Sequence, residues 1–151
     1  MNITPRKINA FMRFKLPLAW LAGVRVKSLN KKSAIVFIKH RWMNQNPFKS
    51  MFWAAQGMAA TMTRGVLVMK KIQDSGRKVS MLVTNQKGNF TKKATGRIRF
   101  ESHDGDLVKD AIEKSAKTNE GQIVVLKSEG FDKEGNSVSN WEFEWSLKVK
   151  F

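Results

Sequence analysis

The sequence lacks several residues on which common kinds of functional site depend. It has no cysteine, which excludes disulfides, thiolate metal ligands and cysteine nucleophiles. Its two histidines, His40 and His103, are too few for a histidine-rich metal site, so no metal is expected. It has no tyrosine, and no apolar run approaches the ~20 residues of a membrane-spanning helix. What is present is one domain of 151 residues, with 42% hydrophobic residues to form a core.

Acidic residues are missing from the first half of the chain. None of the 12 Asp and Glu residues precedes Asp74, whereas half of the 28 Lys and Arg residues do. The net charge of +16 therefore arises mainly before this residue. A basic surface attracts polyanions such as nucleic acid, an anionic membrane or a phosphate-bearing ligand like coenzyme A. It is equally typical of a surface that only keeps a protein soluble.

The pattern of the basic residues disfavours nucleic-acid binding and secretion. Basic residues such as Arg25, Lys39 and Arg41 are scattered, and they are not clustered with the exposed aromatics that stack on bases. Near the N-terminus, Arg13 and Lys15 interrupt the apolar residues, so no signal-peptide core forms. We therefore expect a cytoplasmic protein without a membrane span.

The first part of the chain predicts a broken helix followed by two strands. Residues Ile8–Leu21 form the predicted helix, which Pro17 interrupts. Val24–Leu29 and Ser33–Trp42 are rich in β-branched and aromatic residues, which favours strands joined by a turn at 30–32. The large apolar residues predicted to share one side of the helix are Phe11, Phe14, Leu18 and Leu21.

The segment Asn46–Gly65, NPFKSMFWAAQGMAATMTRG, is the most distinctive part of the sequence. An Asn-Pro turn leads into a helix of small and sulfur-containing apolar residues, for which Ser50 is the predicted N-cap. Apolar residues continue at helical spacing to Ile72, and the turn at 74–76 ends the helix. The apolar stripe consists of Met51, Ala55, Met58, Met62, Val66 and Met69.

The second half of the chain predicts mainly strands. Val79–Phe90, Gly96–Ser102 and Gln122–Phe131 are three of them, and Asp106–Lys117 is an amphipathic helix before the third. The last strand has the clearest alternation, which is typical of a half-buried antiparallel strand. Its apolar side consists of Trp141, Phe143, Trp145, Leu147 and Val149.

These elements predict an α+β fold. A long helix that is apolar nearly all round has to be enclosed, and a curled antiparallel sheet of five or six strands would bury it. Small helix residues such as Ala54 and Gly57 would let the strands approach the helix axis closely. We therefore predict a single hotdog domain over residues 1–151, in which the sheet wraps the long central helix.

Four positions resemble the catalytic segment of hotdog-fold thioesterases of the phenylacetyl-CoA-pathway type. Asn46 matches an Asn on the approach to the central helix, and residues 52–54 lie where that family has His-Gly-Gly. Thr61 lies where the family has an acid, and Ser80 matches a hydroxyl on the next strand. The resemblance is strongest over residues 41–100 and is closest to an uncharacterised bacterial branch of the superfamily.

The resemblance implies a site for an acyl thioester at the interface of a homodimer or homotetramer. Coenzyme A would be part of the substrate, with no separate cofactor. Asn46, Thr61 and Ser80 would be the catalytic positions, with the Asn46–Ala54 region of one subunit facing Thr61 and Ser80 of the other. The backbone amides of Trp53 and Ala54 would polarise the thioester carbonyl, and a flexible side chain such as that of Met58 suits an acyl chain.

Thr61 is a poor substitute for a carboxylate, because an alcohol is hardly ionised near neutral pH. Slow hydrolysis of acyl-CoA-type thioesters and acyl or lipid binding without catalysis both stay open, and a basic nucleic-acid-binding module is a third alternative. The candidate residues also have simple structural interpretations. Asn46 is typical of a turn, Thr61 of a hydroxyl bonded to its own helix, and Ser80 of a solvated strand.

Overall fold

The helices and strands follow the order that the sequence predicts, with bounds that differ by a few residues. The computed structural model describes residues 2–151. Within these residues, no helix has both the length and the hydropathy needed to cross a membrane. The elements are α1 (Pro5–Lys15), α2 (Pro17–Ala22), β1 (Arg25–Leu29), β2 (Ala34–Lys39), the 3-10 helix η1 (Trp42–Asn44), α3 (Trp53–Ser75), β3 (Lys78–Phe90), β4 (Arg97–Ser102), α4 (Gly105–Thr118), β5 (Gln122–Phe131) and β6 (Ser137–Lys150).

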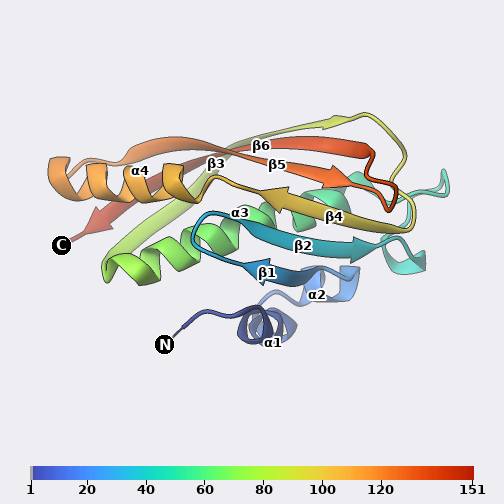
Figure 1. The fold of residues 1–151 in the computed structure, drawn as a ribbon, viewed down its shortest axis with the longest axis horizontal. Coiled ribbons are helices and arrows are strands. Elements are labelled where there is room, and N and C mark those ends of the chain that lie inside the picture. The colour runs from blue at the N-terminus through green and yellow to red at the C-terminus, as the bar shows by residue number, and fades with distance from the viewer. Residues whose placement is uncertain (1) are drawn as a thin grey trace.

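The strands form one antiparallel sheet in the order β1-β2-β4-β5-β6-β3, and α3 packs against one face of it (Figure 1). Contacts of α3 with β1, β2, β4 and β5 show that the sheet curls around the helix. Ala59 and Ala60 are fully buried, and their small side chains allow this close approach. A long helix held in a curled antiparallel sheet is the predicted hotdog arrangement, so the predicted fold is confirmed.

The N-terminal segment packs through its smaller residues. The predicted helix divides at Leu16 into α1 and α2, and the side chain of Asn9 ties α1 to β1 by hydrogen bonds with the N–H and C=O of Val26. Ile8 and Met12 are thereby turned toward the core. The large apolar residues that share one side in the prediction lie in solvent instead: Phe11 is 48% exposed, Phe14 76%, Leu18 71% and Leu21 54%.

The start of α3 and the burial of its polar residues differ from the prediction. The helix begins at Trp53 with Phe52 as its N-cap, so the prediction of Ser50 as the cap is wrong. Ser50 is buried before the helix, where its N–H and Oγ bond to the side chain of Asn46. The helix also buries four polar residues, although the sequence analysis describes it as apolar nearly all round. These are Gln56, Thr63, Arg64 and Lys71.

The strand β3 forms an open edge of the sheet. It has 13 residues and among residues 2–151 pairs with β6 alone, which leaves its outer backbone groups free and most of its side chains exposed. Met81 is 42% exposed, Leu82 65% and Val83 38%, which is unusual for apolar residues in a strand. This edge is a candidate surface for pairing with another strand.

Candidate functional site

A groove of about 510 Å³ lies at the start of α3. One wall is the segment from Asn46 to Gln56, and the other runs from Phe90 to Ala94 after β3. A hydrogen bond of 2.8 Å from the Met51 N–H to the Ala94 carbonyl joins the two walls. The exposed aromatic side chains that line the groove are Phe48, Phe52, Trp53 and Phe90.

The floor of the groove offers both hydrogen-bond donors and an acceptor. Among residues 2–151, no side chain caps α3 and no backbone acceptor is bonded to the N–H of Trp53 or Ala54. The first turn of a long helix carries partial positive charge, so these amides favour an electron-rich oxygen. Gln56 is only 4% exposed, and its Oε1 has no donor among the described residues. Its Nε2 donates to the Met51 carbonyl at 3.5 Å.

Gln56 was missed by the sequence analysis. The signal that would have found it is a polar residue in the first turn of an otherwise apolar helix. A buried amide oxygen without a partner costs free energy unless a ligand or water donates to it. Gln56 is therefore a polar residue of the groove with an acceptor left unpartnered by residues 2–151.

The Asn46 side chain is occupied within its own turn. Its Oδ1 accepts from the N–H of Phe48 at 2.8 Å, and its Nδ2 donates to the Oγ of Ser50 at 3.0 Å. Because these bonds use both ends of the amide, Asn46 shapes the groove rather than presenting a free group to it. The contacts of Asn46 therefore support its interpretation as a turn residue.

Thr61 and Met58 lie further along α3, on one face that the sheet covers only partly. Residues three or four apart share a helix face, and this stripe consists of Ala54, Gly57, Met58, Thr61 and Gly65, all partly exposed. Gly57 lies against the ring of Trp141, which also contacts Gly88 of β3. The open face of the helix is thus directed toward the edge strand.

Ser80 lies on the other side of the sheet from α3. It is directly opposite Lys148 of β6, and its neighbour Met81 is opposite Leu147. Leu147 is fully buried beneath the sheet, whereas Lys148 is exposed. Because directly opposed residues share a face, Ser80 points away from Thr61 of the same chain. The groove brings Asn46 and Trp53 together, and Ala54 follows Trp53 in the first turn of α3. Met58 and Thr61 lie further along the same helix, and within one chain Ser80 is separate from all of them.

Two lysines stand at the mouth of the groove. Lys92 and Lys93 are both exposed and line its outer wall. Lys93 donates to the Phe48 carbonyl at 3.4 Å, and Lys92 donates to Asp132 at 2.5 Å. The second hydrogen bond raises the pKa of Lys92 and lowers the pKa of Asp132. Lys92 thus faces the groove as one partner of an ion pair, and Lys93 lies beside it at the same rim.

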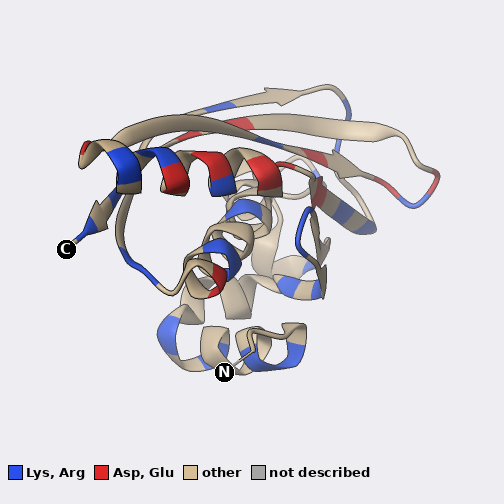
Figure 2. Cartoon of the chain, turned by 60° about the vertical axis from the view of Figure 1, so that its left-hand side comes forward, with Lys and Arg blue, Asp and Glu red and all other residues tan. Residues whose placement is uncertain are grey.

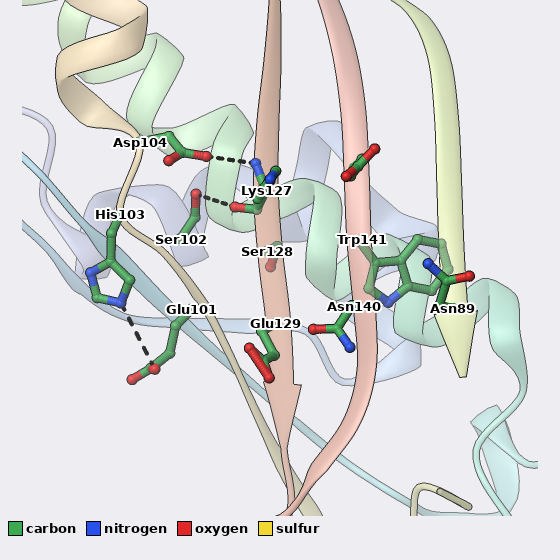
Figure 3. Close-up of a pocket in the computed structure, with 11 residues that line it drawn as sticks. Asn89, Glu101, Ser102, His103, Asp104, Lys127, Ser128, Glu129, Asn140 and Trp141 are labelled. Carbon is green, nitrogen blue, oxygen red and sulfur yellow. Dashed lines mark hydrogen bonds and ion pairs between the residues drawn. The ribbon is translucent and has the colours of Figure 1, made fainter. Parts of the chain in front are cut away.

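A second cleft, of about 360 Å³, opens where β4 and β5 separate (Figure 3). Ser102 donates to the Lys127 carbonyl at 2.7 Å, and the Lys127 N–H donates to Asp104 at 2.6 Å. The carboxylates of Glu101, Asp104 and Glu129 surround this cleft. An anionic ligand would be repelled there, so the groove at the start of α3 is the stronger candidate.

Comparisons with known structures show the same fold. A Pseudomonas aeruginosa protein of unknown function, described as a probable thioesterase, has a TM-score of 0.83 and 21% identity over 97% of each chain. A putative thioesterase from Shewanella oneidensis has a TM-score of 0.80 and 12% identity, covering 95% of this chain and 96% of its own. A Haemophilus influenzae thioesterase has a TM-score of 0.76 and 9% identity, covering 99% of this chain and 93% of its own.

Sequence comparison assigns a family but no reaction. No curated protein matches the chain at a significant level. The model of a domain of unknown function, DUF4442, matches residues 4–147, which is nearly the whole sequence. These three structure neighbours are each below 25% identity, so they establish the fold alone. The chain belongs to the DUF4442 family and has the hotdog fold.

Proposed function

We propose that this protein is a thioesterase-like hotdog protein that binds acyl thioesters in the groove at the start of α3. The observation that carries the proposal is the pair of free amides, Trp53 and Ala54, beside the buried and unpartnered Oε1 of Gln56. The amides suit the thioester carbonyl. Gln56 suits a donor next to it, either a water molecule or an amide N–H of the pantetheine arm of coenzyme A.

The charges and apolar surfaces around the groove fit the rest of an acyl-CoA molecule. Lys92 and Lys93 at the mouth are placed to meet phosphates. Trp53, which is 53% exposed, and the partly exposed Met58 provide an apolar path along α3 for the acyl chain. Binding measurements with different carriers and acyl chain lengths would identify the ligand that the groove prefers.

Binding is supported better than rapid hydrolysis. Thr61 replaces the acid that the resemblance predicts, and no carboxylate precedes Asp74 in the sequence. Asp132 lies near the groove but is bonded to Lys92 and to the N–H groups of Glu134 and Asn136. Slow hydrolysis is the second candidate, and the probable-thioesterase description of the Pseudomonas neighbour favours it.

The proposal includes a homodimer formed through β3. The free backbone edge of this strand and the apolar side chains of Met81, Leu82 and Val83 would be covered by β3 of a second copy. The partly open stripe on α3, which contains Thr61, faces the same edge. The acyl chain would then lie between the two subunits.

Calorimetric titration of the protein with acyl-CoAs of several chain lengths tests the proposal. We expect binding that tightens with chain length, and weaker binding of free coenzyme A. Gln56→Leu should weaken acyl-CoA binding about tenfold because it removes the acceptor. Lys109→Met on α4 is a matched control for Lys92→Met, which should weaken binding several-fold. If no acyl-CoA binds the folded protein, the proposal is wrong.

A further inference from the structure

A second surface of the molecule combines large apolar side chains with uncompensated positive charge. We define the N-terminal patch as Phe11, Phe14, Leu18, Leu21, Trp42 and Met43, whose side chains are 48% to 80% exposed. Soluble monomers rarely expose so many large apolar residues near one another. None of these residues lines the groove at the start of α3, so the inference does not rest on the proposed function.

The residues of the patch belong to neighbouring elements. Figure 1 shows α1 and α2 together on the outside of the molecule, beside β1. α1 contacts α2, and α2 contacts η1. Leu21 of α2 and Trp42 and Met43 of η1 line one shallow groove of about 460 Å³. On each helix the exposed pair is three residues apart, Phe11 with Phe14 and Leu18 with Leu21, so each pair faces one way.

Basic residues surround the patch, and no acid lies among them. The charged residues of α1 are all Lys or Arg and α2 has none, whereas α4 on the other side of α3 carries both signs (Figure 2). Arg41 bonds to the Leu21 carbonyl at 2.6 Å, and Arg13 lies over the Phe14 ring at 5.7 Å. The exposed cations around the patch are Arg6, Lys7, Arg13, Lys15, Lys39 and Arg41.

We propose that the N-terminal patch binds the surface of an anionic lipid membrane. Its apolar side chains would enter the boundary between headgroups and acyl chains, and the surrounding cations would contact anionic headgroups. A tryptophan as exposed as Trp42, at 80%, suits this boundary because its ring is amphipathic. An anionic bilayer is the occupant we favour because its charge is complementary to this acid-free basic surface.

Two other occupants fit the surface less well. A second copy bound patch to patch would bring two acid-free basic clusters together, and like charges repel. The edge strand β3, at the opposite end of the sheet from β1, is the surface suited to self-association. Nucleic acid would match the charge and could stack on aromatic rings such as Trp42, but half of the patch consists of Leu18, Leu21 and Met43, which offer no ring to a base.

The test is co-sedimentation of the full-length protein with lipid vesicles. We expect binding to vesicles of phosphatidylcholine mixed with phosphatidylglycerol, much weaker binding to phosphatidylcholine alone, and weakening by added salt. Replacing Phe14 and Leu18 together by Ser should weaken binding at least tenfold. Replacing Arg13 and Lys15 together by Gln should weaken it about 25-fold, since each cation contributes roughly fivefold.

Matched control variants lie on other surfaces. Ile123→Ser on β5 removes an apolar side chain that is 61% exposed, and Lys114→Gln with Lys117→Gln removes two exposed cations from α4. These controls should bind vesicles like the unchanged protein, and all variants should keep its melting temperature within a few degrees. Trp42→Phe should still bind but should lose part of the change in tryptophan fluorescence on binding.

Several results would overturn the proposal. One is no co-sedimentation with the mixed vesicles, and another is co-sedimentation that the patch variants leave unchanged. A third is binding that depends on Arg13 and Lys15 but not on Phe14 and Leu18 and that RNA competes away, which indicates a polyanion site. A fourth is a patch variant that converts a dimer into a monomer in light scattering, which identifies a second copy as the occupant.

Discussion

The guanidinium of Arg64 on α3 lies over the ring of Phe143 on β6, with its central carbon 3.6 Å from the ring centroid. The side chain is fully buried, and only its Nη1 donates, to the carbonyls of Leu126 at 3.3 Å and Trp141 at 3.4 Å. Its Nε and Nη2 have no acceptor among residues 2–151. Burial lowers the pKa of Arg64 to about 8, which the more distant charge of Asp104 opposes. A buried cation without a carboxylate partner is a cost to the fold.

We expect Arg64→Met to stabilise the protein at neutral pH by roughly 1–4 kcal/mol, because it replaces an uncompensated charge with an apolar side chain. Below pH 8 Arg64 is charged in both the folded and the unfolded state. Above pH 8 the folded state releases the proton and the unfolded state keeps it, so stability of the unchanged protein should rise with pH. Urea unfolding at about pH 7 and about pH 10 measures both effects. If the free energies of unfolding of the unchanged protein and of Arg64→Met differ by the same amount at both pH values, the pKa of Arg64 is not lowered.

Thr61→Glu tests whether the groove is a damaged active site. If the amides of Trp53 and Ala54 still hold a thioester carbonyl, restoring a carboxylate should raise the hydrolysis rate of a bound acyl-CoA by about 10²–10⁴-fold. Release of free thiol measures the rate, and Thr61→Gln is the control of similar size without a charge. An unchanged rate in a folded variant that still binds acyl-CoA would mean that the protein is only a binder.

The proposed dimer predicts a specific sensitivity at the edge strand. Replacing Met81 and Val83 together by Lys should give a monomer in light scattering, because the two charges would be buried at the pairing edge. Ile123→Lys is the control, since this residue is also exposed but lies on a strand with neighbours on both sides. A monomeric unchanged protein at micromolar concentration would refute the proposed assembly.

Gly105 at the start of α4 is expected to tolerate no side chain. A Cβ there would collide with the backbone carbonyl of Lys31 and lie 2.8 Å from the Cα of Lys32, and backbone cannot move aside cheaply. Gly105→Ala should therefore lower the free energy of unfolding by about 1–3 kcal/mol. Gly121→Ala, where the nearest atom is at 3.9 Å, should change it by less than ~1 kcal/mol. Equal effects in urea unfolding would show that α4 shifts to make room.

The sequence was sufficient to predict the architecture, because alternation and helical spacing are local signals that burial imposes along a chain. The strand Gln122–Phe131 has the predicted bounds, and Gly76 ends α3 as expected. The enclosure of one long helix by antiparallel strands followed from the apolar character of that helix. That the position which the resemblance assigns to an acid holds Thr61 was also readable without a structure, since it is a matter of residue identity.

The tertiary structure decided the direction of side chains and the partners they find. Pairing with β6 placed Ser80 on the face opposite α3, because a shift of one residue reverses every side chain of a strand. The turn at 46–50 occupied the amide of Asn46, and packing at the helix start left Gln56 without a donor. The apolar side predicted for the first helix points to solvent, since the bonds of Asn9 to Val26 orient α1. Such contacts join residues distant in sequence, and local periodicity carries no information about them.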